Sequence, residues 1–109
     1  MQWQVLTTEE ELKTLLEKSH SKPQVIFKHS TRCSISSVIK TRLESGVAPE
    51  HIDFHYLDLL AHRSLSNKIA DDLNVYHESP QVLLLQNGEC VFDESHQVIR
   101  MQDIIAEVV

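Results

Sequence analysis

Cys33 is the residue of this sequence best placed to do chemistry. It comes just after the apolar run from Gln24 to Lys28 and just before a segment with helical spacing. The first turn of a helix presents free backbone N–H groups and the positive end of the helix dipole, and both stabilise a thiolate. Arg32 and Lys28 add positive charge nearby. We therefore expect a nucleophilic thiolate at Cys33. The alternative is an inert cysteine buried between strand and helix.

Ser36 stands three residues after Cys33, where a C-x-x-C redox pair has its second cysteine. A second thiol attacks a mixed disulfide formed on the first, and a serine cannot do this. The spacing therefore predicts a monothiol mechanism. The Ser36 hydroxyl can donate a hydrogen bond to the thiolate one helical turn away. The alternative is a serine that faces solvent in the first turn of the helix.

The dipeptide Ser79-Pro80 lies directly before a second apolar run, Gln81 to Leu85. A proline at this place can have a cis peptide bond, which is a constrained feature. We expect the cis form. The alternative is a trans proline that only begins the strand.

Histidines offer a second source of proton-transfer chemistry, and the chain has seven. His29 and His77 are expected to flank the Cys33 groove, where either could move a proton or bind a carboxylate. The alternative for both is an ordinary surface histidine. His51 and His55 are four residues apart in a strand-like segment, where this spacing does not converge on a metal as it would on a helix. No Cys/His cluster has the spacing of a zinc finger, so no metal site is expected.

Cys90 is the second of two cysteines, and we expect it to be a packed thiol. It lies in a predicted edge strand, on the face that also carries Phe92. A disulfide to Cys33 would need Cα atoms within about 7 Å, which the predicted order of elements does not favour.

The elements that position these residues alternate between strand and helix. Thr8 and Glu11 form a capping box ahead of the first helix, and Asn87-Gly88 favours a tight hairpin turn. Hydrophobic periodicity predicts strands at 3–6, 24–28, 52–57, 81–85 and 89–93, and helices from about 9 to 19, from about 33 to 46, and around 65–73 and 101–108.

This order implies a parallel sheet with an antiparallel edge and helices on its faces. The thioredoxin-like fold is one of the few topologies that right-handed crossovers leave open. We predict a single thioredoxin-like α/β domain over residues 1–109, with a mixed sheet of about five strands and helices on both faces. In such proteins the loop before the fourth strand packs beside the reactive cysteine and holds an extended substrate.

Composition excludes several other classes of function. The formal net charge is -6 at pH 7, which argues against a basic face for nucleic acid and against a basic membrane-surface helix. No apolar run approaches the ~20 residues of a membrane helix. The N-terminus lacks the charged and hydrophobic regions of a signal peptide, so we expect a cytoplasmic protein.

Two segments together resemble the monothiol bacilliredoxin family: Phe27 to Ser36 and His77 to Gln81. These are thioredoxin-fold proteins of the bacillithiol system, and the resemblance extends over essentially the whole chain. It implies that Cys33 removes bacillithiol from mixed disulfides on oxidised proteins and that Pro80 is the cis-proline.

The sequence departs from the family at the two residues that flank the cysteine. Many members read Thr-Cys-Pro-Ile-Ser, whereas here Arg32 precedes Cys33 and Ser34 takes the place of the proline. A proline at the first helical position lacks a backbone N–H, which Ser34 restores. The small thiol is therefore bacillithiol by resemblance, or another low-molecular-weight thiol.

We predict a monothiol thiol–disulfide oxidoreductase without a bound cofactor, whose partners are S-thiolated client proteins and a low-molecular-weight thiol that serves as co-substrate. Cys33 is the predicted nucleophile. The residues expected to bind substrate or tune the sulfur are His29, Thr31, Arg32, Ser34, Ser36, His77, Ser79 and Pro80.

Two other classes of function are open at this point. A thioredoxin-like binding module would use the same groove without turnover and would not need Cys33. A glutaredoxin-like protein would use Cys33 to ligate an iron–sulfur cluster shared across a dimer, and would be coloured. The Gly-Phe that follows the cysteine in that class is replaced here by Ser34-Ile35.

Overall fold

The computed structural model describes residues 1–108, which form one central sheet and its covering helices. The predicted domain runs to Val109, which lies outside the described residues. The elements in chain order are β1 (Gln4–Val5), α1 (Glu9–Lys18), β2 (Gln24–His29), α2 (Ser34–Ser45), β3 (Asp53–Asp58), α3 (Arg63–Leu73), β4 (Gln81–Gln86), β5 (Glu89–Ser95), the 3-10 turn η1 (His96–Val98) and α4 (Met101–Glu107).

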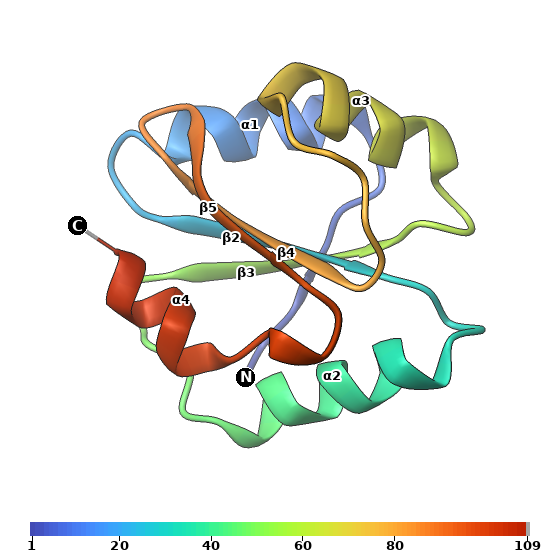
Figure 1. Ribbon diagram of the computed structural model, residues 1–109. Coiled ribbons are helices and arrows are strands. Elements are labelled where there is room, and N and C mark those ends of the chain that lie inside the picture. The colour runs from blue at the N-terminus through green and yellow to red at the C-terminus, as the bar shows by residue number, and fades with distance from the viewer. Residues whose placement is uncertain (109) are drawn as a thin grey trace.

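The sheet has the strand order β1-β3-β2-β4-β5. β1, β3 and β2 are parallel, whereas β4 and β5 are antiparallel to their neighbours. Helices α1 and α3 cover one face, and α2 and α4 cover the other (Figure 1). The predicted thioredoxin-like architecture is confirmed. None of the helices in residues 1–108 is long and apolar enough to cross a membrane.

The capping box at the start of α1 is confirmed. The Thr8 hydroxyl accepts a hydrogen bond from the Glu11 backbone N–H, and the Glu11 carboxylate accepts one from the Thr8 N–H. The first predicted strand is shorter than expected, because only Gln4 and Val5 pair with β3. Trp3 lies outside it and stacks on Phe27 with 5.6 Å between ring centroids.

Alternation along β2 divides the core into two clusters. Val25 and Phe27 pack beneath α2 and α4, with residues such as Ile39 and Ile104. Ile26 packs on the opposite side, beneath α1 and α3. Because successive side chains of a strand point to opposite faces, Lys28 shares the α1/α3 face with Ile26, and His29 shares the α2/α4 face with Phe27.

The β4–β5 hairpin turns at Asn87 and Gly88, which have the positive φ values of 56° and 78° that a tight hairpin turn needs. A bulge then shifts the register, so that Leu84 faces Phe92 while its neighbour Leu85 faces Cys90. Cys90 therefore joins the α1/α3 cluster and Phe92 the other one. The prediction that these two residues share a face is wrong, because a bulge adds one residue to the alternation.

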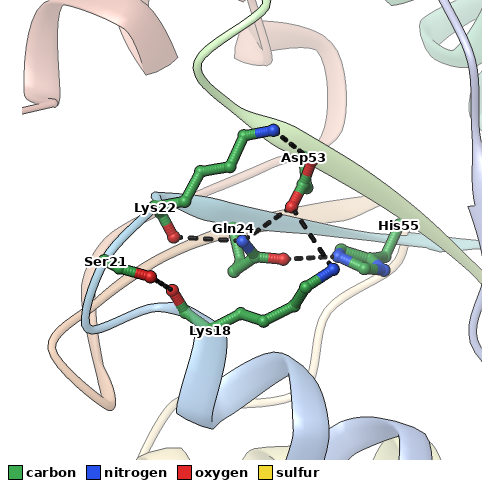
Figure 2. A network of polar contacts seen from close by, with 6 residues as sticks. All are labelled: Lys18, Ser21, Lys22, Gln24, Asp53 and His55. Carbon is green, nitrogen blue, oxygen red and sulfur yellow. Dashed lines mark hydrogen bonds and ion pairs between the residues drawn. The ribbon is translucent and has the colours of Figure 1, made fainter.

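A network of polar side chains lies at the end of the sheet where β2 and β3 begin (Figure 2). The Gln24 amide nitrogen donates to Asp53 Oδ2 at 2.9 Å and to the Lys22 carbonyl at 3.0 Å, and the Gln24 Oε1 lies 2.8 Å from His55 Nε2. Lys22 and Lys18 pair with the Asp53 carboxylate at 2.8 and 3.9 Å. This network ties the loop after α1 to β3.

Candidate active site

Cys33 is the N-cap residue of α2, with an extended backbone (φ -101°, ψ 118°). Its backbone N–H donates to the Ser30 carbonyl at 3.1 Å, and its carbonyl accepts from the Ser37 N–H at 3.1 Å. The thiol is free and partly exposed. No side chain caps the helix, and its first turn contains no acidic residue. Cys33 therefore lies at the N-terminus of a 12-residue helix, which is the positive end of the helix dipole.

Ser36 is fully buried, so the alternative of a solvent-facing serine is wrong. Its hydroxyl lies 2.6 Å from His29 Nδ1 and accepts a hydrogen bond from the Ser30 backbone N–H at 3.1 Å. These bonds link the end of β2, the turn after it and the first turn of α2. Ser36 thus holds the turn that leads to Cys33, and its hydrogen bonds go to His29 and Ser30 in place of the thiol.

His29 is the last residue of β2, one residue beyond the end of the predicted strand. Its side chain is buried, and its ring lies 5.7 Å from Phe27 and 5.4 Å from Tyr56, measured between centroids. Burial, aided by the charge of Lys40, lowers the pKa of His29, so the ring is neutral near neutral pH. The surface alternative is wrong. A neutral, fixed imidazole faces Ser36 beneath the Cys33 turn.

Three of the predicted residues surround Cys33 on the outside of the molecule. Thr31, Arg32 and Ser34 are all exposed. Arg32 takes part in no ion pair with the residues that the structure describes. Its guanidinium can therefore meet an incoming carboxylate next to the sulfur.

Lys28 and His77 do not lie where the sequence suggested. Lys28 Nζ donates to the Ser66 carbonyl at 3.0 Å and lies 3.3 Å from His77 Nδ1. Ser66 belongs to α3, on the face of the sheet opposite α2 (Figure 1). The expectations that Lys28 adds charge beside Cys33 and that His77 flanks the Cys33 groove are corrected. The alternation of β2 is the sequence signal that separates Lys28 from His29.

The Ser79–Pro80 peptide bond is cis, as expected. Lys28 pairs with Gln81 where β2 and β4 run antiparallel, so the residues just before β4 lie beside the end of β2. The cis-proline loop and the Cys33 turn therefore emerge at the same end of neighbouring strands. The Ser79 hydroxyl is buried and has no hydrogen-bond partner among residues 1–108.

Gln81 braces the cis-proline loop, a role the sequence did not reveal. Its buried amide donates to the Tyr76 carbonyl at 2.9 Å and accepts from the Glu78 N–H at 3.4 Å. The Pro80 carbonyl accepts from the His96 N–H at 2.9 Å, and the His96 ring lies 3.0 Å from the Glu78 carboxylate. The loop is thus fixed to β4 and to the turn after β5.

A family model described as monothiol bacilliredoxin BrxC matches residues 4–104. The chain belongs to the monothiol bacilliredoxin family. A solved structure described as a candidate oxidoreductase with a thioredoxin fold is 29% identical over 94% of this chain and 90% of that one, with a TM-score of 0.83. The protein is therefore a bacilliredoxin-family chain of thioredoxin fold and oxidoreductase type.

Classical thioredoxins share the fold with this bacilliredoxin-family chain. Thioredoxin O2 of Arabidopsis thaliana is 23% identical over 97% of this chain and 93% of that one, with a TM-score of 0.74. The thioredoxin of Malassezia sympodialis is 16% identical over 97% and 88%, with a TM-score of 0.76. Among residues 1–108 of the bacilliredoxin chain, no group of three or more His, Cys, Asp or Glu side chains could hold a metal ion.

Proposed function

We propose that this bacilliredoxin-family protein removes a small thiol, bacillithiol by family membership, from mixed disulfides on oxidised client proteins. The observation that supports this most is the placement of Cys33. Cys33 is the N-cap residue of α2, and its thiol is partly exposed. It lies at the same end of the sheet as the loop that contains cis-Pro80. Ser36 occupies the position of a resolving thiol, and a buried hydroxyl cannot form a disulfide.

The reaction is a thiol–disulfide exchange. The Cys33 thiolate attacks the small-thiol sulfur of the mixed disulfide, and a new S–S bond forms as the old one breaks. The client leaves as a thiolate and takes a proton from solvent. The small thiol stays on Cys33 as a disulfide. A second molecule of the small thiol then attacks the outer sulfur, which releases a small-thiol disulfide and restores the Cys33 thiolate.

The residues around the sulfur have separate tasks in this mechanism. The turn held by Ser36 and His29 fixes the position of Cys33 at the positive end of α2. Arg32 attracts carboxylates on the small thiol. The backbone beside cis-Pro80 binds the client or thiol through hydrogen bonds.

The experiment follows release of a reduced client protein from its bacillithiolated form, in the presence of excess bacillithiol. The wild-type protein and Cys90→Ser should release the client at the same rate, and Cys33→Ser should reduce the rate at least about 100-fold, as for loss of a covalent nucleophile. Equal rates for wild type and Cys33→Ser would refute the proposal. A glutathionylated client, run in parallel, tests the identity of the small thiol.

A further inference from the structure

Lys28 is a buried cation without a carboxylate partner. Its side chain is fully buried, and no carboxylate of residues 1–108 lies within ion-pair distance of its ammonium. Removing an ammonium from water costs several kcal/mol even after relaxation of the protein, and a methionine of similar length would fill the same space without that cost. The contacts of the ammonium must therefore account for its presence.

Those contacts join three separate elements. From β2, the ammonium donates to the Ser66 carbonyl of α3 and lies 3.3 Å from His77 Nδ1 in the loop before β4. The Ser66 hydroxyl lies 3.2 Å from His77 Nδ1 as well. Because an ammonium only donates hydrogen bonds, His77 Nδ1 accepts, and the ring carries its proton on Nε2.

The protonation states near neutral pH favour this contact. Burial lowers the pKa of Lys28 to about 8, so the amine is mostly charged at pH 7. Burial also lowers the pKa of His77, as do the charges of Lys28 and Arg63, while Glu78 acts in the opposite direction. A neutral imidazole therefore faces a cationic donor. Protonation of His77 would place two positive charges about 3.3 Å apart.

His77 is two residues before Ser79. Its ring contacts both β2 and α3, through Lys28 and Ser66. The rest of the loop is held by Val75, which packs on the α1/α3 cluster, by Gln81, which bonds Tyr76 and Glu78, and by the contact between Glu78 and His96. We propose that Lys28 is a positioning residue that holds the cis-proline loop in its substrate-binding shape through His77. This inference rests on the proposed function, in which that loop binds the client.

Lys28 acts at a distance from the chemistry, because its side chain bonds to α3, whereas Cys33 begins α2 on the opposite face of the sheet. Loss of its contact should weaken client binding and leave the reactivity of the Cys33 sulfur unchanged. Loss of the contact should raise KM for a protein client roughly tenfold, which corresponds to about 1.4 kcal/mol.

The test compares Lys28→Met, His77→Leu and the double variant with the wild type. Replacement of a buried ion by an apolar residue of similar volume is often neutral or stabilising, so Lys28→Met is expected to fold. Each single variant should raise KM for a thiolated client roughly tenfold with kcat changed less than about twofold, and the double variant should match the singles because the residues act as one unit. Alkylation of Cys33 by iodoacetamide should keep its rate.

His77→Gln is the conservative control, because its side-chain oxygen can accept the bond from Lys28. It should restore KM toward the wild-type value. The wild type should also lose client affinity as the pH falls and His77 becomes protonated, whereas His77→Gln should not show this acid loss. An unchanged KM in Lys28→Met, or additive effects in the double variant, would overturn the inference.

Hydrogen exchange supplies a readout that does not depend on activity. In Lys28→Met, amides of residues 74–79 should exchange faster, while those of β2 and α2 should keep their protection. If the protein does not de-thiolate clients but this local exchange is observed, the proposed function fails and the attachment of the loop by Lys28 stands. If exchange is unchanged in the loop, the positioning role is refuted whatever the activity.

Discussion

Two buried histidines on neighbouring strands give this molecule an internal comparison. His29 ends β2 and His55 lies in β3, near the opposite end of the sheet. Each is bonded to a neutral polar side chain, His29 to Ser36 and His55 to Gln24. Burial is the main cause that lowers the pKa of both. By these criteria alone the two sites look equivalent.

Their connections separate them. The Ser36 partner of His29 also holds Ser30, whose carbonyl accepts from the Cys33 N–H. The Gln24 partner of His55 leads to Asp53 and its two lysines, a network of structural contacts (Figure 2). A perturbed pKa is therefore a weak signal of function. The informative signal is position at the carboxyl end of a parallel strand, next to a reactive side chain.

Substitution of the two histidines gives the largest expected difference. His29→Leu should slow de-thiolation roughly tenfold or more, because it removes the partner that orients Ser36 beneath the Cys33 turn, and small misplacements of a reacting group are costly. His55→Leu should leave the rate within about twofold. The measurement is the rate of client release at saturating client concentration. Equal effects of the two variants would break the comparison.

Ser36→Ala tests the link between His29 and the turn. It leaves the buried His29 Nδ1 and the part-buried Ser30 N–H without their partner, and a buried group left unsatisfied costs about 1–3 kcal/mol. We expect a slower rate than wild type and a lower midpoint of urea unfolding. Ser37→Ala is the matched control, since Ser37 is exposed one residue further along α2. The link is disproved if both variants behave alike.

Acid stability should report on His55. Its pKa is lowered from 6.5 to about 4, so the folded state resists protonation that the unfolded state accepts. The stability is complete above pH 6.5 and is lost as the pH falls toward 4, by up to roughly 3 kcal/mol at about 1.4 kcal/mol per unit. Urea unfolding from pH 7 to 4 should show a shallower loss for His55→Phe than for wild type. Identical slopes would assign the acid sensitivity to other groups.

The two cysteines give a second comparison, in which the reactivity of a partly exposed thiol is set against that of a packed one. Burial raises the pKa of the Cys90 thiol to about 11. Cys90 should therefore react with iodoacetamide much more slowly than Cys33 at pH 8, and only become comparable above pH 11. Mass spectrometry of the two cysteine peptides provides the measurement. Faster labelling of Cys90 at pH 8 would contradict its packed position.

Much of the fold was predictable because local patterns and topology rules agree. The Thr8 capping box, the Asn87-Gly88 turn and the alternation of strands and helices each have a local physical cause. The start of α2 also follows from the sequence, and it places Cys33. The bulge that separates Cys90 from Phe92 has no such signal, because it depends on pairing between strands.

The sequence predicted the positions of Cys33 and Pro80 in the candidate site, but not the directions in which the neighbouring side chains point. The cis bond before Pro80 and the position of Cys33 are present. His29 and Ser36 face each other inside the molecule, whereas Lys28 and His77 face α3. Which face a side chain takes depends on where the strand ends. The predicted strand ends at Lys28, so it leaves out His29 and does not assign Lys28 and His29 to opposite faces.

The most direct test of the account is to locate the small thiol after a single turnover. The protein is mixed with an equal amount of a bacillithiolated client and quenched with acid, and the cysteine peptides are analysed by mass spectrometry. The account predicts that the bacillithiol mass appears on the peptide of Cys33 as the client becomes reduced, in the wild type and in Cys90→Ser. Reduction of the client with no adduct on Cys33, or with the adduct on Cys90, would contradict it.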